Sequence, residues 1–407
     1  MDADRLDADR LRIERIGAHL VELPFRFSFG HALASRSSST NLIVMIQLAD
    51  GSIGYGEGVP REYVTGETAE TALARVIDEY GPQLMGRELP DREVASRLRA
   101  LRDELHLFKA VPGAAWCAVE TALLDAIGKA TGRPATDLLG GAARQTVRYG
   151  GVAPFASGPA LIGLLLFFRA YGFQDVKLKL GRGTDKDVTT VRLARQILGE
   201  HVDLRGDANC AWTADEALAM AERLRPYGVD SYEQPVSADD VAGLTMLTAA
   251  LPEDIVVDES LCSVADARRL IEARACSVLN VRVSKCGGPL AALELVKLAD
   301  EAGLICQLGA QVGESGILTA AGRLVATVAT PGFRHHEGAD NLFLLKRDLT
   351  VENLTVRPGG RGDALSGRGL GVQVRHSTLV ELSTRHAVVG ARSRTYSVSR
   401  SSMGGQS

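Results

Sequence analysis

Hydrophobic and polar residues follow two different rhythms along this chain. Strand-like alternation occurs in IGAHLVELPF and in TNLIVMIQLADGSIGYGEG, with a turn predicted at Asp50-Gly51. Residues 68–132 instead carry apolar residues three and four positions apart, which predicts helices, the last ending at Gly132 before Pro134. Strands followed by helices are typical of an α+β domain, which we expect over residues 12–140.

From about residue 147 short apolar strands alternate with helical stretches. About eight such strand–helix units fit a (β/α) barrel better than an open sheet. We therefore expect an α/β protein with a (β/α)7β TIM-like barrel over residues 141–341 and an N-terminal α+β capping domain. Residues 342–385 are expected to pack back on the capping domain, and residues 1–11 and 386–407 are expected to be disordered because they are polar.

Composition narrows the possible partners. The chain is 45% apolar and 24% charged, with a net charge of −4, so a nucleic-acid partner is not expected. The longest apolar run, Leu161–Phe168, is too short to cross a bilayer, so no membrane partner is expected either. The N-terminus has no apolar stretch typical of a secretory signal, and the six cysteines occur singly without a CxxC pair. Both features favour a cytoplasmic protein.

Acidic residues occur at the ends of three consecutive predicted barrel strands. Asp207 ends LRGDAN, Glu233 ends SYEQP and Asp258 ends IVVDES. Chemistry in such barrels collects at the C-terminal ends of the strands, so these carboxylates should converge. A single acid there is usually a helix cap, but three would repel each other unless a cation lay between them. Oxygen ligands of this kind suit Mg²⁺, with Mn²⁺ as an alternative.

Lysines occur on the flanking strands. Lys177 and Lys179 lie two apart in DVKLKLG and therefore leave the same face of a strand, and Lys285 ends NVRVSK. Lysine is a weak base at neutral pH unless a neighbouring positive charge favours its neutral form. Two ammonium groups on one strand face repel each other unless an anion or a metal-bound substrate lies between them.

The chain resembles the enolase superfamily, in its muconate-lactonizing-enzyme subgroup, because it carries similar motifs in the same order. They are KLK, DAN, EQP, DES and SKCGG. The resemblance covers about residues 12–380. It implies that Asp207, Glu233 and Asp258 bind one Mg²⁺, and that Lys179 and Lys285 are acid/base groups on opposite faces of the substrate, assisted by Lys177. It also implies proton abstraction next to a carboxylate through an enediolate, which a Lys base and Mg²⁺ together make possible.

Two segments of the capping domain resemble the mobile loops of that family, Phe25–Thr40 and Gly56–Thr68. They are expected to cover the barrel mouth and select the substrate. The candidate substrate contacts are His31, Arg36, Arg61, Tyr63, Asn209 and Glu314. Dipeptide epimerases of the subgroup carry an Asp-x-Asp after the last strand, and this chain has HHEGAD there instead.

Three functions remain open at this stage. The first is an isomerase, either a muconate cycloisomerase-like enzyme or a racemase/epimerase of N-acylated amino acids. The second is a lyase, a dehydratase of acid-sugar or o-succinylbenzoate synthase type. The third is a non-catalytic metal-binding barrel, against which the two lysines argue. A small carboxylate substrate and a homo-oligomer are expected in either enzymatic case.

Overall fold

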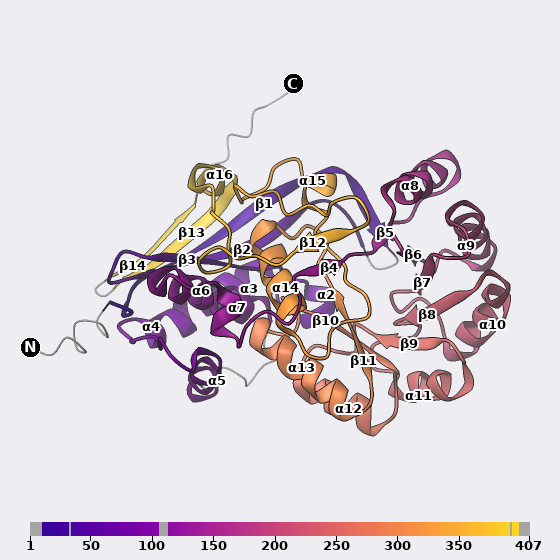
Figure 1. Cartoon of the computed structure of the whole chain (residues 1–407), viewed down its shortest axis with the longest axis horizontal. Coiled ribbons are helices and arrows are strands. Elements are labelled where there is room, and N and C mark those ends of the chain that lie inside the picture. Colours follow the sequence, from indigo (N-terminus) through magenta and orange to yellow (C-terminus); the bar gives the residue numbers. More distant parts are fainter. Residues whose placement is uncertain (1–9, 32–33, 106–112, 391–392, 399–407) are drawn as a thin grey trace, which may run out of the picture.

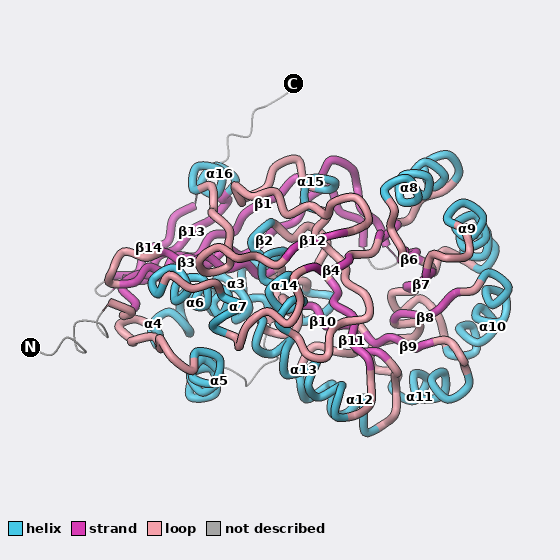
Figure 2. The backbone as a smooth tube through the Cα atoms, viewed as in Figure 1, coloured by secondary structure: helices cyan, strands magenta, loops and turns pink. Residues whose placement is uncertain are grey.

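The protein consists of an antiparallel sheet with its own helices and a curled parallel sheet surrounded by helices, as the computed structural model shows (Figures 1 and 2). The structure describes residues 10–31, 34–105, 113–390 and 393–398. Residues 1–9, most of the segment expected to be disordered at the N-terminus, lie outside the described residues, whereas Leu11 is buried. The expected fold class is confirmed.

The capping domain is built on a five-stranded sheet in the order β14-β13-β1-β2-β3. Its strands are β1 (Ile13–His31), β2 (Ala34–Leu48), β3 (Ile53–Gly58), β13 (Ser383–Gly390) and β14 (Ser393–Val398). The predicted turn between β2 and β3 is present, and Gly51 takes the positive φ of 84° that it requires. The capping helices are α2 (Glu62–Thr65), α3 (Ala69–Ala74), the π-helix η1 (Arg75–Tyr80), α4 (Gly81–Leu84), α5 (Val94–Glu104), α6 (Ala114–Thr131) and α7 (Ala135–Leu138).

The expectation of a disordered tail from residue 386 onward needs correction. β13 pairs antiparallel with β1 from Arg15↔Gly390 to Val21↔Ser383, and β14 pairs with β13. Ala387 and Val389 are buried on this strand, with the less buried Val388 between them. The Ser- and Arg-rich composition of residues 391–407 concealed β14, and the apolar end of β13, HAVVG, was missed with it. The residues from 399 onward lie outside the described part of the chain.

The barrel is a seven-stranded parallel sheet in the order β11-β10-β9-β8-β7-β6-β5. Its strands are β5 (Gly151–Ala153), β6 (Asp175–Lys179), β7 (Asp203–Asp207), β8 (Val229–Glu233), β9 (Asp254–Val257), β10 (Val278–Arg282) and β11 (Ile305–Gly309). The segment around His336 lies between the first and last of these strands. It forms a parallel bridge to Leu308, and its carbonyl accepts a hydrogen bond of 2.8 Å from the Gly150 N–H. This segment is the eighth strand position that the sequence predicts.

Helices follow the barrel strands in turn and cover the outside of the sheet (Figure 1). They are α8 (Gly158–Tyr171), α9 (Thr184–Leu198), α10 (Ala214–Leu224) with the 3-10 turn η2 (Arg225–Tyr227), α11 (Val241–Ala250), α12 (Val264–Glu272), α13 (Pro289–Glu301) and α14 (Gly316–Val328). The remaining elements are the short strands β4 (Thr146–Arg148) and β12 (Arg361–Asp363) and the helices α15 (Asn341–Leu344) and α16 (His376–Leu382). No helix in the described ranges is long and apolar enough to cross a membrane.

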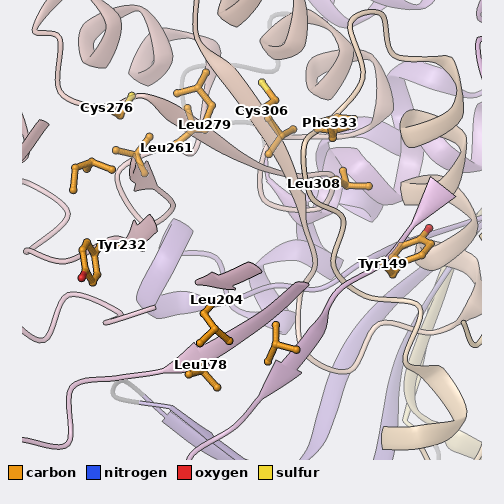
Figure 3. Packing of buried hydrophobic residues seen from close by; sticks show 14 of the residues in the cluster. Tyr149, Leu178, Leu204, Tyr232, Leu261, Cys276, Leu279, Cys306, Leu308 and Phe333 are labelled. Carbon is orange, nitrogen blue, oxygen red and sulfur yellow. The ribbon is translucent and has the colours of Figure 1, made fainter. Parts of the chain in front are cut away.

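The apolar core of the barrel lies between the strands and these helices. Leu178, Leu204, Tyr232, Leu279 and Leu308 each come from a different strand, and all belong to one buried cluster (Figure 3). Since side chains alternate along a strand, their neighbours in sequence face the inside of the barrel. Those neighbours are mostly charged or polar.

Candidate active site

The inside of the barrel holds a network of buried acids and bases. Lys177 on β6 donates hydrogen bonds to both oxygens of Glu233 on β8, at 3.0 and 3.2 Å, and to Glu337 Oε2 at 2.7 Å. Glu337 follows the bridge segment at His336, and its other oxygen accepts from Arg205 on β7 at 2.7 Å. Glu233 also accepts from Asn280 at 3.0 Å and from Gln307 at 2.6 Å. Glu233 therefore lies at the centre of the network.

Lys179 lies one step closer to the strand end than Lys177. Its ammonium donates to Asp207 Oδ2 at 2.5 Å and to Asn209 Oδ1 at 3.0 Å. Asp207 is fully buried, whereas Lys179 lines a cavity over the strand ends. Lys179 is therefore placed to meet a molecule that enters this cavity.

Asp258 follows β9 and contacts two cations. Arg282 on β10 donates to Asp258 Oδ2 at very short range, and Lys285 donates to Oδ1 at 2.7 Å. Lys285 also donates to the backbone carbonyls of Asp258, at 2.5 Å, and of Asn280, at 3.3 Å. Only Arg282 of these two cations lines the cavity. Lys285 therefore contacts the Asp258 carboxylate but is not among the residues that line the cavity.

The charges in this network shift one another's ionisation. Burial opposes the charge on Glu233, but Lys177, Arg282 and Lys179 hold its pKa well below the usual range. Burial also opposes the charge on Lys177, but Glu233, Glu337 and Asp207 keep its pKa above the ordinary value. Lys177 and Glu233 are therefore both ionised in the folded protein.

Asp207, Glu233 and Asp258 are the carboxylates that could hold a metal. Asp207 and Glu233 are partners in the β7–β8 register, and Glu233 stands beside Val256, two residues before Asp258. Within the described residues no three His, Cys, Asp or Glu side chains are arranged to hold a metal as they stand. Each of the three carboxylates is instead paired with a lysine or an arginine.

Glu259 provides a test of whether a cation fits here. Burial and the carboxylates of Asp258 and Asp207 raise the pKa of Glu259 to about 7. Its Oε1 accepts from Asn209 at 3.0 Å, and its buried Oε2 has no hydrogen-bond partner. Glu259, Asp258 and Asp207 therefore form an acidic cluster with one unpartnered carboxylate oxygen. A hard divalent cation would stabilise such a cluster.

The capping domain covers the cavity. Phe29 from β1 and Tyr63 from α2 line it together with Lys177 and Lys179, and the Arg36 guanidinium lies 5.7 Å from the Tyr63 ring centre. Buried Arg61 donates to the carbonyl of Val312, after β11, at 2.7 Å, and so joins the cap to the barrel. The cavity itself measures only about 50 Å³. An adjoining cavity of about 460 Å³, lined mostly by apolar residues, shares Phe29, Val152, Gly338 and Asp340 with it.

The predicted substrate contacts divide into two groups. Asn209 and Tyr63 line the cavity beside Lys179, whereas Arg36 and Glu314 do not. Glu314 Oε1 accepts from its neighbouring Gln311 N–H at 2.6 Å, and burial raises its pKa to about 8. His31 ends β1, and its side chain lies outside the described residues.

The sequence-based interpretation missed Arg282, Glu259 and Glu337, although all three line the cavity. Arg282 had a clear signal, since it lies two residues after Asn280 and so on the same inward face of β10. Glu259 follows Asp258 directly and was passed over as part of DES. Glu337 gave no comparable signal, because its contacts depend on how the barrel closes.

Comparisons with known proteins agree with this architecture. Residues 15–140 match the mandelate racemase/muconate lactonizing enzyme N-terminal domain, and residues 165–378 match the family described as enolase C-terminal domain-like. The N-succinyl Arg/Lys racemase of Bacillus cereus has a similar structure, with a TM-score of 0.86 and 27% identity over 93% of this chain and 100% of that one.

Two further solved structures are similar. One is a dipeptide epimerase of Enterococcus faecalis complexed with Mg and a dipeptide, with a TM-score of 0.81 and 27% identity over 89% of this chain and 99% of that one. The other is the muconate lactonizing enzyme of Pseudomonas fluorescens complexed with muconolactone, with a TM-score of 0.85 and 27% identity over 92% of this chain and 100% of that one. Racemases, epimerases and lactonizing enzymes are all isomerases. The chain belongs to the mandelate racemase/muconate lactonizing enzyme family of the enolase superfamily, as an isomerase.

Proposed function

We propose that this isomerase is Mg²⁺-dependent and moves a proton at the carbon next to the carboxylate of a small substrate, with Lys179 as the base. The observation that carries the proposal is the position of Lys179. It lies at the end of β6, lines the cavity and contacts Asp207, the first of the three carboxylates.

Asp207, Glu233 and Asp258 are the residues that would hold the metal, with Mn²⁺ as an alternative to Mg²⁺. Their oxygen donors and the unpartnered oxygen of Glu259 support this assignment. The presence of Mg in the related E. faecalis epimerase supports it as well. When bound, the metal would supply positive charge beside the substrate carboxylate, where removal of a proton creates a second negative charge.

Lys179 accepts a proton only in its neutral form. Lys177 is its neighbour on the same face of β6 and stays cationic between Glu233 and Glu337. This fixed positive charge attracts the carboxylate of a substrate toward the cavity. Asn209 Oδ1, which accepts from Lys179, fixes the direction of its ammonium. Phe29 and Tyr63 line the cavity from the side of the capping domain.

The size of the two cavities suggests the form of the substrate. The space beside Lys179 holds little more than a carboxylate group, whereas the adjoining apolar cavity is about 460 Å³. A substrate with a carboxylate at one end and an apolar distal group would fill both. The lyase alternative has no comparable support, because the similar structures described above are isomerases.

Two further properties belong to the same proposal. All six cysteines are unpaired, as expected for a protein of the reducing cytoplasm. We also expect a homo-oligomer, and light scattering coupled to gel filtration measures this directly. A mass equal to the 43.3 kDa of one chain would contradict it.

The test of the proposed function is proton NMR in D₂O with muconolactones, N-succinyl amino acids and dipeptides. With Mg²⁺ present, the wild-type enzyme should exchange the proton next to the carboxylate of at least one of these compounds. Exchange should stop after chelation and in Lys179→Ala. Full exchange by chelated enzyme or by Lys179→Ala would refute the proposal.

A further inference from the structure

β10 and the turn after it supply two cations to Asp258, and the two differ in what they can reach. The Lys285 side chain has no exposed surface. Its three N–H groups can serve three acceptors, and the structure gives it three: Asp258 Oδ1, the Asp258 carbonyl and the Asn280 carbonyl. Lys285 therefore has no hydrogen left for a substrate.

Arg282 is placed differently. It is the last residue of β10 and shares the inward face of that strand with Asn280, whereas Leu279 and Val281 belong to the outer core. Its guanidinium lines the cavity, pairs with Asp258 and lies 3.7 Å from Glu233. One nitrogen donates to Gln311 at 3.2 Å, while Nε is buried without a partner. Arg282 thus has donor capacity at the cavity wall.

The strand order places Lys179 and Arg282 on opposite sides of the three carboxylates. Lys179 ends β6 and Arg282 ends β10, and the strands β7, β8 and β9 with Asp207, Glu233 and Asp258 lie between them. A carboxylate substrate held among these acids by a cation would have the ammonium on one side and the guanidinium on the other.

We propose that Arg282, and not Lys285, is the catalytic group facing Lys179, and that the enzyme therefore transfers protons on one face of its substrate only. This inference rests on the proposed function. A guanidinium stays protonated in proteins, so it can donate hydrogen bonds and stabilise negative charge but cannot accept a proton from carbon. Lys285 is then a positioning residue that fixes Asp258.

One-sided transfer excludes racemisation that uses a base on each face, and it favours cycloisomerisation. In that reaction Lys179 takes the proton next to the carboxylate, and the electron pair of the C–H bond forms the enediolate. The enediolate then breaks the bond between the adjacent carbon and a ring oxygen, which leaves as a carboxylate on the same molecule. Ring closure follows the same steps in reverse, and Lys179 returns the proton. No atom or electron is gained or lost by the substrate.

The first experiment follows the stereochemical course in D₂O with Mg²⁺, using both enantiomers of N-succinylphenylalanine and, in muconolactone, the two methylene protons next to the carboxylate. We expect exchange in only one enantiomer of N-succinylphenylalanine, with retained configuration and no antipode, or of only one of the two methylene protons of muconolactone. Exchange of both enantiomers, interconversion between them, or exchange of both methylene protons would overturn the proposal, including the case in which Glu259 acts as a second base. If neither compound exchanges at all, the proposed function fails for them, and the metal-binding measurement below still tests the placement of Arg282.

The second experiment alters the group itself. Arg282→Lys introduces a side chain that can accept a proton, so this variant should gain exchange of the second enantiomer. Arg282→Met should still exchange the same enantiomer as the wild type. Its exchange rate should fall roughly 10²–10³-fold, as when one charge-stabilising donor is removed. Lys285→Arg should not change which enantiomer exchanges, and exposed Arg225→Lys is the matched control. Two results would contradict the assignment. One is that Arg282→Lys exchanges no second enantiomer, and the other is that Lys285→Arg exchanges both enantiomers.

A binding measurement gives a readout that needs no turnover. Arg282 contacts Asp258 and Glu233, so it competes with a cation for these carboxylates. Mn²⁺ titrations followed by electron paramagnetic resonance, without substrate, should show several-fold tighter binding in Arg282→Met than in wild type. Arg225→Lys should match wild type. Unchanged Mn²⁺ affinity in Arg282→Met would show that the guanidinium does not face the carboxylates.

Discussion

A lysine ammonium has three N–H groups, and Lys285 directs all three at acceptors within the protein. Replacing it with methionine leaves the buried Asp258 carbonyl without this donor and Asp258 Oδ1 without a counter-charge. We expect Lys285→Met to lower the free energy of unfolding by about 1–3 kcal/mol, because a buried carbonyl and a buried carboxylate oxygen lose their donor while Arg282 still pairs with Asp258. Urea unfolding measures this loss.

Lys297→Met is the matched control. Lys297 lies on the exposed face of α13 and pairs with Glu301 at 3.6 Å. Exposed pairs of this kind contribute less than ~1 kcal/mol. If the two variants unfold at the same urea concentration, the buried contacts of Lys285 do not stabilise the protein.

At the scale of elements, β3 lies directly against α6. Gly54, Gly56 and Gly58 recur at every second position and face the helix, and a methyl group on Gly56 would stand 2.0 Å from the Ala118 carbonyl oxygen. That oxygen belongs to the helix backbone, so it cannot turn aside. Gly56→Ala should therefore destabilise the protein by roughly 1–3 kcal/mol or more, as measured by urea unfolding.

Gly163 offers the opposite case in the same measurement. It lies exposed within α8, and a methyl group there would meet nothing within 4 Å. Gly163→Ala should raise stability by about 0.5–1 kcal/mol, because alanine loses less freedom in a helix. Similar changes in both variants would argue against close packing of β3 on α6.

Glu57 of β3 connects the cap to the start of α14. Its oxygens accept from Asn41, from the N–H and hydroxyl of Ser315, and from the Leu318 N–H, at 2.6–2.9 Å. Burial raises its pKa from 4.5 to about 7 despite these bonds. As pH rises from 4.5 to 7, Glu57 ionises in the unfolded chain before it ionises in the folded one. Its contribution to the free energy of unfolding is therefore fully present below pH 4.5 and is lost as the pH rises toward 7.

Glu57→Gln removes that titration. At every pH the variant lacks one of the two carboxylate oxygens that accept hydrogen bonds. Above pH 7 only the wild type carries a buried negative charge at this position, which lowers its stability. The gap in unfolding temperature between wild type and Glu57→Gln should therefore be larger at pH 5 than at pH 8. Differential scanning calorimetry at the two pH values measures it, and a gap that widens with pH would contradict the raised pKa.

Elements with strong local signals could be predicted from the sequence. α6 ends at Gly132, which takes a positive φ of 72°, and α10 begins with a capping box of Thr213 and Glu216. β13 and β14 could not, because such short strands depend on the strands they pair with, β1 for β13 and β13 for β14. The position of Arg282 in the cavity wall could be predicted from its spacing to Asn280, whereas the contacts of Lys285 with Asp258 needed the structure.

At the scale of the whole molecule, the barrel supplies the charges and the cap supplies the cover. Asp207, Glu233 and Asp258 come from three neighbouring strands, while Phe29 and Tyr63 come from two capping segments. Neither part forms the cavity alone. The contacts of Arg61 with Val312 and of Glu57 with Ser315 hold the two parts together. Binding at the carboxylates should therefore affect the stability of the entire chain.

A cation that binds only the folded protein raises its stability by mass action. At a hundredfold excess over its dissociation constant, Mg²⁺ should contribute about 2.7 kcal/mol. Calorimetry should show a higher unfolding temperature for the wild type in Mg²⁺ than in EDTA. Asp258→Asn should lose most of this shift relative to its own EDTA value, because one of three carboxylates is gone. Glu301→Gln, at an exposed position on α13, should keep the shift. An equal Mg²⁺ shift in Asp258→Asn and wild type would mean that the ion binds elsewhere.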